Sequence, residues 1–308
     1  MGESGQKKLA EASVLVIGAG GLGSPVLLYL AAAGVGRLGI IDDDEVALSN
    51  LQRQVLHSTE TIGYKKVDSA QKRLNGLNDE VEIVTYDARF TPENAMGIFS
   101  DGWDVIVDGT DNIPTRYLVD DACFLSGIPW VYGSIYRFEG QVSVFNHQGG
   151  PCYRDLFTTP PPPGSVPSCA EGGVLGVLPG VIGSLQANEA LKMILGLGEV
   201  LTGRLIVYDA EQMTFNTLTF SHVKDREKVH NLDHAASMFS SPEWCTVADP
   251  KGSFQEGDAS HEGPMFHHIS MTDFIARREE GWAPFILDVR SIMEYRQARV
   301  ASCDHQVA

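Results

Sequence analysis

A glycine-rich turn between an apolar run and a helix is the stretch whose residue types point most clearly to chemistry. The turn, Gly18-Ala19-Gly20-Gly21-Leu22-Gly23, follows the β-branched run Val14 to Ile17 and precedes a helical run, Ser24 to Ala33. Absent Cβ atoms let the backbone approach a phosphate, and N–H groups at a helix start favour an anion. A second apolar run, Leu38 to Ile41, ends at Asp42, whose carboxylate can accept hydrogen bonds from ribose hydroxyls. Together these residues predict a nucleotide site.

Three charged side chains could complete a site for a triphosphate. Arg53 and Lys66 each follow a polar or glycine-containing turn, and Asp111 follows the apolar run Trp103 to Val107. All three are expected near the carboxyl edge of the sheet, where open α/β sheets bind ligands. A carboxylate at Asp111 could hold Mg²⁺ against phosphate oxygens. The alternatives are surface ion pairs for the two cations and, for Asp111, a cap on the helix that starts near Pro114.

One cysteine has the surroundings of a reactive thiol. Cys169 lies in the small-residue sequence Pro167-Ser168-Cys169-Ala170-Glu171-Gly172-Gly173, which follows a proline-rich crossover. A structural cysteine usually has bulky apolar neighbours, whereas this one is expected to reach solvent and to form thiolate. We therefore predict a nucleophilic role for it.

The remaining cysteines and histidines show no metal-ligand spacing. Cys152 and Cys245 each lack a partner two residues on, because Asp155 and Ala248 stand where a CxxC pair would need sulfur. His57 is interpreted as a surface residue or a satisfied core residue. No structural zinc is predicted.

Bulk composition excludes some classes of partner. The 308 residues carry a net charge of −17, which argues against non-specific binding to nucleic acid or to an anionic membrane. Five cysteines at irregular spacings suggest no disulfide framework, so a reducing cytoplasm is expected. Residues 1–12 are polar and show no secretory signal, and the longest apolar run, Val26 to Ala33, is too short to span a bilayer.

The order of apolar runs predicts the fold. Strands alternate with helices, which indicates a doubly wound, Rossmann-like α/β sheet with a parallel N-terminal half and an antiparallel extension. Expected strands are 14–17, 38–41, 81–86, 103–107, 129–134, 140–146, 204–209 and 215–220; expected helices are 24–33, 67–75, 114–126 and 181–195. Residues 1–222 are predicted to form the nucleotide-binding domain, 223–264 a linker region and 265–308 a second α/β unit.

Several separate blocks resemble the ThiF/MoeB-type adenylyltransferases of the ubiquitin-activating superfamily, which act on sulfur-carrier proteins. Beside the glycine turn and Asp42, the blocks are Ser49-Asn50-Leu51-Gln52-Arg53-Gln54, Lys66, Thr110-Asp111-Asn112, the segment around Cys169 and Gly183-Ser184-Leu185-Gln186-Ala187. The tail resembles the first part of a rhodanese domain, through Leu287-Asp288-Val289-Arg290 and Glu294-Tyr295.

This resemblance implies a reaction and its residues. ATP would lie over Gly21 with its ribose on Asp42; Asn50, Arg53 and Lys66 would grip the phosphates; and Asp111 would hold Mg²⁺. The C-terminal glycine carboxylate of a ubiquitin-like carrier ending in Gly-Gly would be adenylylated, and Cys169 would handle sulfur or link covalently to the carrier. A homodimer is also implied. The predicted nucleotide contacts are Gly18, Gly20, Gly21, Gly23, Asp42, Ser49, Asn50, Leu51, Gln52, Arg53, Lys66, Asp111 and Asn112, and the predicted catalytic residues are Arg53, Lys66, Asp111 and Cys169.

Three departures from the family keep two other functions open. Related proteins start with a helix whose arginine reaches the partner subunit's ATP, and this sequence starts after that point. Their two CxxC pairs are half lost here, and the rhodanese-like part stops before its active-site loop, so it is expected to be incomplete and inactive. The alternatives are an NAD-dependent oxidoreductase, which the glycine turn and Asp42 would serve equally well, and a non-catalytic scaffold that binds the carrier.

Overall fold

The computed structural model describes residues 2–161, 173–226, 228–239, 287–288 and 305–306. The chain divides into two compact units, Met1–Lys251 and Gly252–Ala308. In the second unit the described residues form one parallel pair, β9 (Leu287–Asp288) with β10 (His305–Gln306). The first of these strands lies in the block Leu287-Asp288-Val289-Arg290 that resembles a rhodanese domain, and the rhodanese-like assignment of residues 265–308 stays a prediction.

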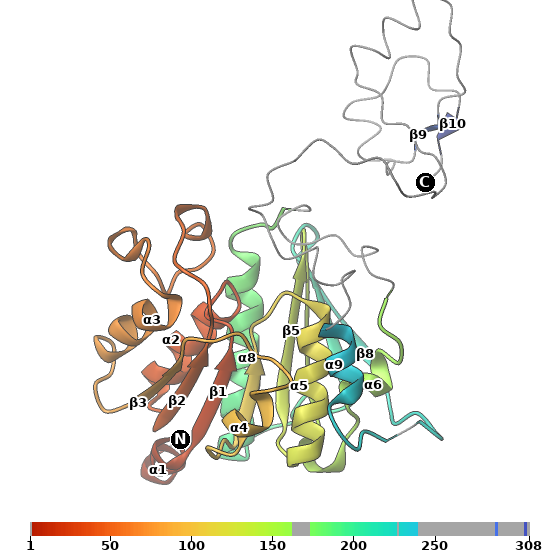
Figure 1. Ribbon diagram of the computed structural model, residues 1–308, viewed down its shortest axis with the longest axis horizontal. Coiled ribbons are helices and arrows are strands. Elements are labelled where there is room, and N and C mark those ends of the chain that lie inside the picture. The colour runs from red at the N-terminus through yellow and green to blue at the C-terminus, as the bar shows by residue number, and fades with distance from the viewer. Residues whose placement is uncertain (1, 162–172, 227, 240–286, 289–304, 307–308) are drawn as a thin grey trace, which may run out of the picture. The chain divides into compact units, whose positions relative to one another are not determined.

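A mixed sheet runs through the first unit (Figure 1), in the order β3-β2-β1-β4-β5-β6-β7-β8. Its members up to β5 pair in parallel, and β5 to β8 pair antiparallel. The strands are β1 (Ser13–Ile17), β2 (Arg37–Ile41), β3 (Glu82–Tyr86), β4 (Val105–Asp108), β5 (Trp130–Tyr136), β6 (Glu139–Phe145), β7 (Arg204–Asp209) and β8 (Thr214–Thr219). This is the predicted fold class, a parallel half with an antiparallel extension.

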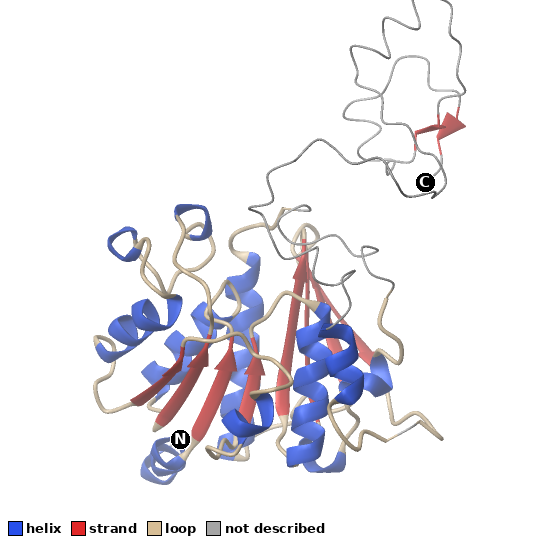
Figure 2. Cartoon of the chain, viewed as in Figure 1, coloured by secondary structure: helices blue, strands red, loops and turns tan. Residues whose placement is uncertain are grey.

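Helices flank both faces of the sheet (Figure 2) and bury two separate apolar clusters. They are α1 (Gly2–Glu11), α2 (Gly23–Ala33), α3 (Lys66–Asn75), α4 (Ala95–Phe99), α5 (Ile113–Ser126), α6 (Tyr153–Leu156), α8 (Leu178–Leu195) and α9 (Asp233–Phe239). In β1, Val14 and Val16 face the cluster that α1, α2, α3 and α8 contribute to, while Leu15 and Ile17 face the cluster of α4, α5, α6 and α9. Because neighbouring strand residues point to opposite faces, a central strand is apolar throughout, as the sequence suggested.

The carboxyl ends of β1 and β4 meet at the switch point of the sheet. From β1 the chain adds strands on the side of β2 and β3, and from β4 it adds strands on the other side. The two strand ends touch backbone to backbone, since a Cβ on Gly109 would lie 2.9 Å from the Gly18 carbonyl oxygen and 3.0 Å from that of Ile17. In doubly wound sheets, ligands usually bind at this point.

Two of the helices that the sequence did not reveal, α1 and α9, lie at the beginning and at the end of the described residues of the first unit. Helix α1 buries only Gly5 and Leu9, so its polar sequence was interpreted as a lead-in. Helix α9 lies inside the predicted linker 223–264, yet Ala235 and Met238 belong to the buried cluster of α5. Residues 233–239 are therefore part of the domain rather than a linker.

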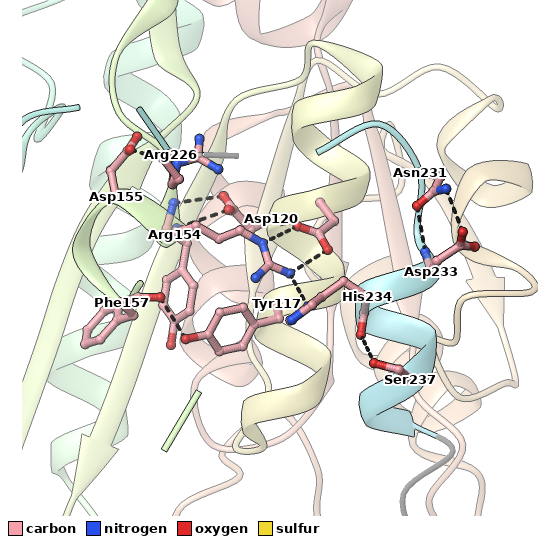
Figure 3. Close-up of polar contacts among 12 residues, drawn as sticks. Tyr117, Asp120, Arg154, Asp155, Phe157, Arg226, Asn231, Asp233, His234 and Ser237 are labelled. Atoms are coloured by element: carbon pink, nitrogen blue, oxygen red, sulfur yellow. Dashed lines mark hydrogen bonds and ion pairs between the residues drawn. The ribbon is translucent and has the colours of Figure 1, made fainter. Parts of the chain in front are cut away.

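Polar contacts fasten α9 as well (Figure 3). The guanidinium of Arg154, at the start of α6, donates to both carboxylate oxygens of Asp121 on α5, at 2.6 and 2.7 Å, and to Nδ1 of His234 on α9, at 3.0 Å. Tyr117 on α5 donates its hydroxyl to the Phe157 carbonyl at 2.8 Å. One buried arginine thus joins three helices. Among the described helices, none has the length and apolar character needed to cross a membrane.

Candidate nucleotide-binding site

The glycine turn between β1 and α2 has the shape that its sequence predicted. Gly18 has φ of +97°, a value that side-chain-bearing residues rarely adopt, and a Cβ on Gly23 would overlap the Gly18 carbonyl oxygen. At Gly20 a Cβ would meet only Gln54 Nε2, at 3.6 Å. The turn therefore needs glycine at its two ends for the backbone, whereas a Cβ at Gly20 would make only an ordinary contact.

Asp42 and Lys66 lie together at the end of β2. The Asp42 carboxylate accepts hydrogen bonds from the N–H groups of Ala19 (2.8 Å) and Asp44 (3.0 Å), so it ties the second strand to the glycine turn. Burial raises the pKa of Asp42, and the nearby ammonium of Lys66 counteracts the shift. Lys66 Nζ is 3.9 Å from Asp42 Oδ1 and 2.7 Å from Asp44 Oδ2. The buried ammonium is thus paired with two acids that follow β2, of which Asp44 is exposed.

Arg53 lies over the turn itself. A Cβ on Gly21 would be 3.6 Å from Arg53 Cγ and 3.1 Å from Pro179 at the start of α8. The half-buried guanidinium has a weak bond of 3.4 Å to the Ser49 carbonyl. Arg53 makes no ion pair among the described residues. The alternative interpretation of Arg53, as a member of a surface ion pair, therefore does not hold among the described residues.

Asp111 belongs to the loop that follows β4, whose backbone touches the glycine turn through Gly109 and Gly18. Its side chain is exposed, and the helix that begins next is capped by its neighbour: Asn112 Oδ1 accepts from the Thr115 N–H at 2.9 Å. The capping alternative for Asp111 is therefore wrong. Asn112 was predicted as a nucleotide contact, and its side-chain oxygen is occupied by this capping hydrogen bond.

Other predicted residues are placed less directly. Ser49 and Asn50 lie in the short 3₁₀ turn Leu48–Asn50, Leu51 follows it, and the Asn50 carbonyl accepts from the N–H groups of Arg53 and Gln54. Gln52 is exposed and lies against Gly176. Cys169 lies outside the described residues. The 3₁₀ turn Leu48–Asn50 therefore positions the Arg53 segment through backbone hydrogen bonds to the Asn50 carbonyl.

Two residues near the turn were not predicted as contacts. Gln54, 4% exposed, lies beside Gly20, and its Oε1 has no hydrogen-bond partner within the part of the chain that the structure describes. His57 is buried between the Ala19 carbonyl and Ser69 Oγ, 2.9 Å from each, as the satisfied core interpretation predicted. Burial lowers the pKa of His57, so the ring is neutral at pH 7. In sequence, only the position of Gln54 beside Arg53 hinted at its place.

Asp155 stands where a CxxC pair starting at Cys152 would need its second cysteine, and its side chain contacts other groups of the protein. The Asp155 carboxylate, buried in α6, accepts from the N–H groups of Cys152 (2.9 Å) and Val223 (3.1 Å) and from Arg226 Nε (3.0 Å). Burial would raise the pKa of Asp155, but these hydrogen bonds lower it overall, and burial raises the pKa of the Cys152 thiol. This donor set suits a carboxylate held by protein groups more than a metal. Cys245 lies outside the described residues, so the absence of zinc stays a prediction.

A glycine turn, a buried acid and two cations at the switch point of a doubly wound sheet are typical of a nucleotide-binding α/β protein. Comparison with known families narrows that class. The ThiF family model matches residues 1–229, and the chain belongs to the ThiF family.

Individual relatives agree with this family. A sulfur carrier protein adenylyltransferase of Thermus thermophilus is 56% identical over 224 residues, which are 71% of this chain and 82% of that protein. A probable adenylyltransferase/sulfurtransferase MoeZ of Mycobacterium tuberculosis is 52% identical over 236 residues, which are 75% of this chain and 60% of that protein. This chain therefore spans less than two thirds of the second relative. A crystal structure of E. coli MccB with MccA-N7isoASN has a TM-score of 0.65 at 20% identity, covering 74% of this chain and 69% of that chain, and supports the fold.

Proposed function

We propose that this protein adenylylates the C-terminal glycine carboxylate of a ubiquitin-like sulfur-carrier protein at the expense of ATP. The observation that carries the proposal is the meeting of two cations and two acids at one glycine turn. Arg53 lies over Gly21, Lys66 lies 3.9 Å from Asp42, and the Asp111 loop touches Gly18 through Gly109. A dinucleotide site needs the turn and Asp42 but neither cation.

Each residue has a role that its surroundings support. The ribose hydroxyls would donate to Asp42, since each of its oxygens accepts one backbone N–H and keeps a further lone pair. Arg53 would receive phosphate oxygens above Gly21, with a planar guanidinium suited to two of them at once. Lys66 would exchange its contact with Asp44 for a phosphate, because the Asp44 side chain is 67% exposed and can turn into water.

The chemistry is a substitution at the α-phosphorus. A glycine carboxylate oxygen forms the new bond to phosphorus, the bond to the bridging oxygen of the β-phosphate breaks, and pyrophosphate leaves with that electron pair. Two anions must approach one another, so the protein contributes positioning and positive charge rather than a covalent step. The acyl adenylate that results is then open to attack by sulfur.

A divalent cation fits the exposed carboxylate of Asp111. Magnesium prefers one or two carboxylates together with phosphate oxygens, and Asp111 is free of the capping role that would occupy it. When bound, Mg²⁺ would neutralise phosphate charge. We include this ion, with Asp111 as its ligand, in the proposal.

The relatives support the substrate. The Thermus protein is described as a sulfur carrier protein adenylyltransferase, and the ThiF family match over residues 1–229 spans all of the predicted nucleotide contacts. The proposal extends to a homodimer and to sulfur handling by Cys169. It does not extend to the second activity in the name of the MoeZ relative.

Exchange of labelled pyrophosphate into ATP tests the proposal. We expect the full chain to catalyse exchange only with a sulfur carrier ending in Gly-Gly, and not with the same carrier shortened by its last glycine. Exchange no faster with the intact carrier than without it would refute the proposal. Binding of the intact carrier without exchange would favour the scaffold, and binding of NAD in preference to ATP would favour the oxidoreductase. Sedimentation equilibrium tests the dimer.

A further inference from the structure

A buried ion pair lies beneath the loop that carries Asp111. Asp108, the last residue of β4, is completely buried, and Arg116, in the first turns of α5, is 9% exposed. Arg116 Nε is 3.6 Å from Asp108 Oδ2, and neither atom has a hydrogen-bond partner within the described part of the chain. The guanidinium also lies over the Tyr132 ring, 5.5 Å from its centre. For a buried ion pair with unsatisfied hydrogen-bonding atoms, the cost of removing the charges from water can exceed their attraction, so stability alone does not explain this pair.

Both members of the pair hold Thr110, the residue before Asp111. Asp108 Oδ1 accepts from the Thr110 N–H at 2.9 Å and from its hydroxyl at 2.7 Å. Arg116 donates from its NH2 group to the Thr110 carbonyl at 3.2 Å. Every polar group of Thr110 is therefore bonded to the pair, and the peptide that leads into Asp111 is fixed from both sides.

The other neighbours of Asp111 are fixed as well. Asn112 is locked as the cap of α5. The carbonyl of Asp108 accepts from Gln186 Nε2 of α8 at 2.7 Å, so a helix on the opposite face of the sheet holds the end of β4. Gln186 is itself completely buried, and a Cβ on Gly133 would collide with its amide. Asp111 is exposed but lies between two anchored residues.

We propose that Arg116 and Asp108 are positioning residues that aim the Asp111 carboxylate at the cation bound with the nucleotide phosphates. The proposal rests on the function proposed above. It assigns the ion pair to metal-assisted nucleotide binding and distinguishes it from the second buried arginine pair, Arg154 with Asp121, which joins helices. Groups that orient a metal ligand typically affect metal affinity about 10–100-fold when removed.

The test measures binding rather than turnover. An ATP analogue with a methylene bridge between its α- and β-phosphorus atoms is titrated calorimetrically into the full chain, with Mg²⁺ and with a chelator. The ratio of the two Kd values is the metal enhancement. Variants are Arg116→Lys, which keeps the charge without the fork, and Thr110→Val, which keeps the shape without the hydroxyl. Asp111→Asn is the reference for a lost metal ligand, and Arg154→Lys is the matched control for a disturbed buried arginine.

We expect Arg116→Lys and Thr110→Val to lower the metal enhancement about tenfold, with the metal-free Kd within about twofold of the unsubstituted protein. Arg154→Lys should lower the melting temperature and leave the enhancement unchanged. If Arg116→Lys does not fold, Thr110→Val alone decides. An enhancement equal to that of the unsubstituted protein in both variants, with Asp111→Asn impaired, would overturn this inference alone. No binding of the analogue by the unsubstituted protein, or an unimpaired Asp111→Asn, would overturn the proposed function and this inference with it.

Discussion

Replacing Lys66 by methionine tests the phosphate-binding role that we propose for it, and the adjacent Lys65, for which we propose no such role, provides the control. Methionine keeps the length of the buried side chain and removes the ammonium next to Asp42. The matched control is Lys65→Met: the Lys65 side chain is 39% exposed, and its Nζ is 3.4 Å from Asp87 Oδ1. The two residues are adjacent in sequence but differ in burial and in the acid that each one meets.

The expected loss of stability follows from the two contacts of Lys66. Unit charges about 4 Å apart attract by roughly 4 kcal/mol at an effective dielectric constant near 20, which bounds the contact with Asp42. The contact with Asp44 counts for at most about 1 kcal/mol because that side chain is largely exposed. Removing the ammonium also removes the cost of burying it, so we expect the free energy of unfolding to fall by about 1–2 kcal/mol in urea titrations.

The loss of activity should be larger than the loss of stability. An ammonium placed against the phosphates is expected to contribute about 10²–10³-fold to pyrophosphate exchange at saturating carrier. The pKa of Asp42 should also rise further without Lys66, since burial raises it and the ammonium opposes the shift. As the pH is lowered, Asp42 gains a proton and stops accepting from the ribose. ATP affinity should therefore begin to decrease at a higher pH in Lys66→Met than in the unsubstituted protein. Exchange within about twofold of the unsubstituted rate, or an equal loss in Lys65→Met, would refute this reasoning.

Three further predictions use other residues. Gly23→Ala should destabilise the protein by about 3 kcal/mol or more, because its Cβ overlaps backbone, whereas Gly20→Ala should stay within about 1 kcal/mol in urea unfolding; equal losses would contradict the described turn. Burial raises the pKa of Asp120 from 3.8 to about 6, so the folded state binds the extra proton between these values and stability should fall as pH rises through them, by at most about 3 kcal/mol. Asp120→Asn should remove this slope from unfolding curves taken between pH 4 and 7, and an unchanged slope would count against it. Cys169→Ala should keep pyrophosphate exchange and impair sulfur delivery to the carrier, and a folded variant without exchange would contradict that division.

The parts of the fold that bury apolar residues on both faces were predictable. The run 204–209 was predicted with its observed bounds, and the glycine turn, its strand and its helix were found within a residue or two. In these elements periodicity and burial coincide. Helices α1 and α9 escaped because each buries only two residues and α9 gains its place from packing against α5. Such support from the rest of the fold leaves no local pattern.

The same division holds within the site. Residue type and spacing predicted roles for Asp42, Arg53 and Lys66, and the structure places them by the glycine turn and the end of β2, while their roles stay predictions. The sequence offered Asp111 as a cap of α5, whereas the structure gives that role to Asn112, whose side chain also accepts hydrogen bonds from a helix start. The sequence allowed an ion pair for Lys66 but did not identify Asp44 as its partner, and it did not place Asp108 and Arg116 under the Asp111 loop. These depend on how α3 and α5 pack against the strand ends.

The contacts of Asp155 and α9 bear on how this domain can be shortened for study. A version ending at residue 222, directly after the sheet, would take away two of the donors that neutralise a buried carboxylate, Val223 and Arg226. It would also uncover the surface of α5 on which Ala235 and Met238 pack. Such a fragment would be prone to self-association through that bared helix. Domain designs for crystallisation or calorimetry should therefore keep at least residues 2–239.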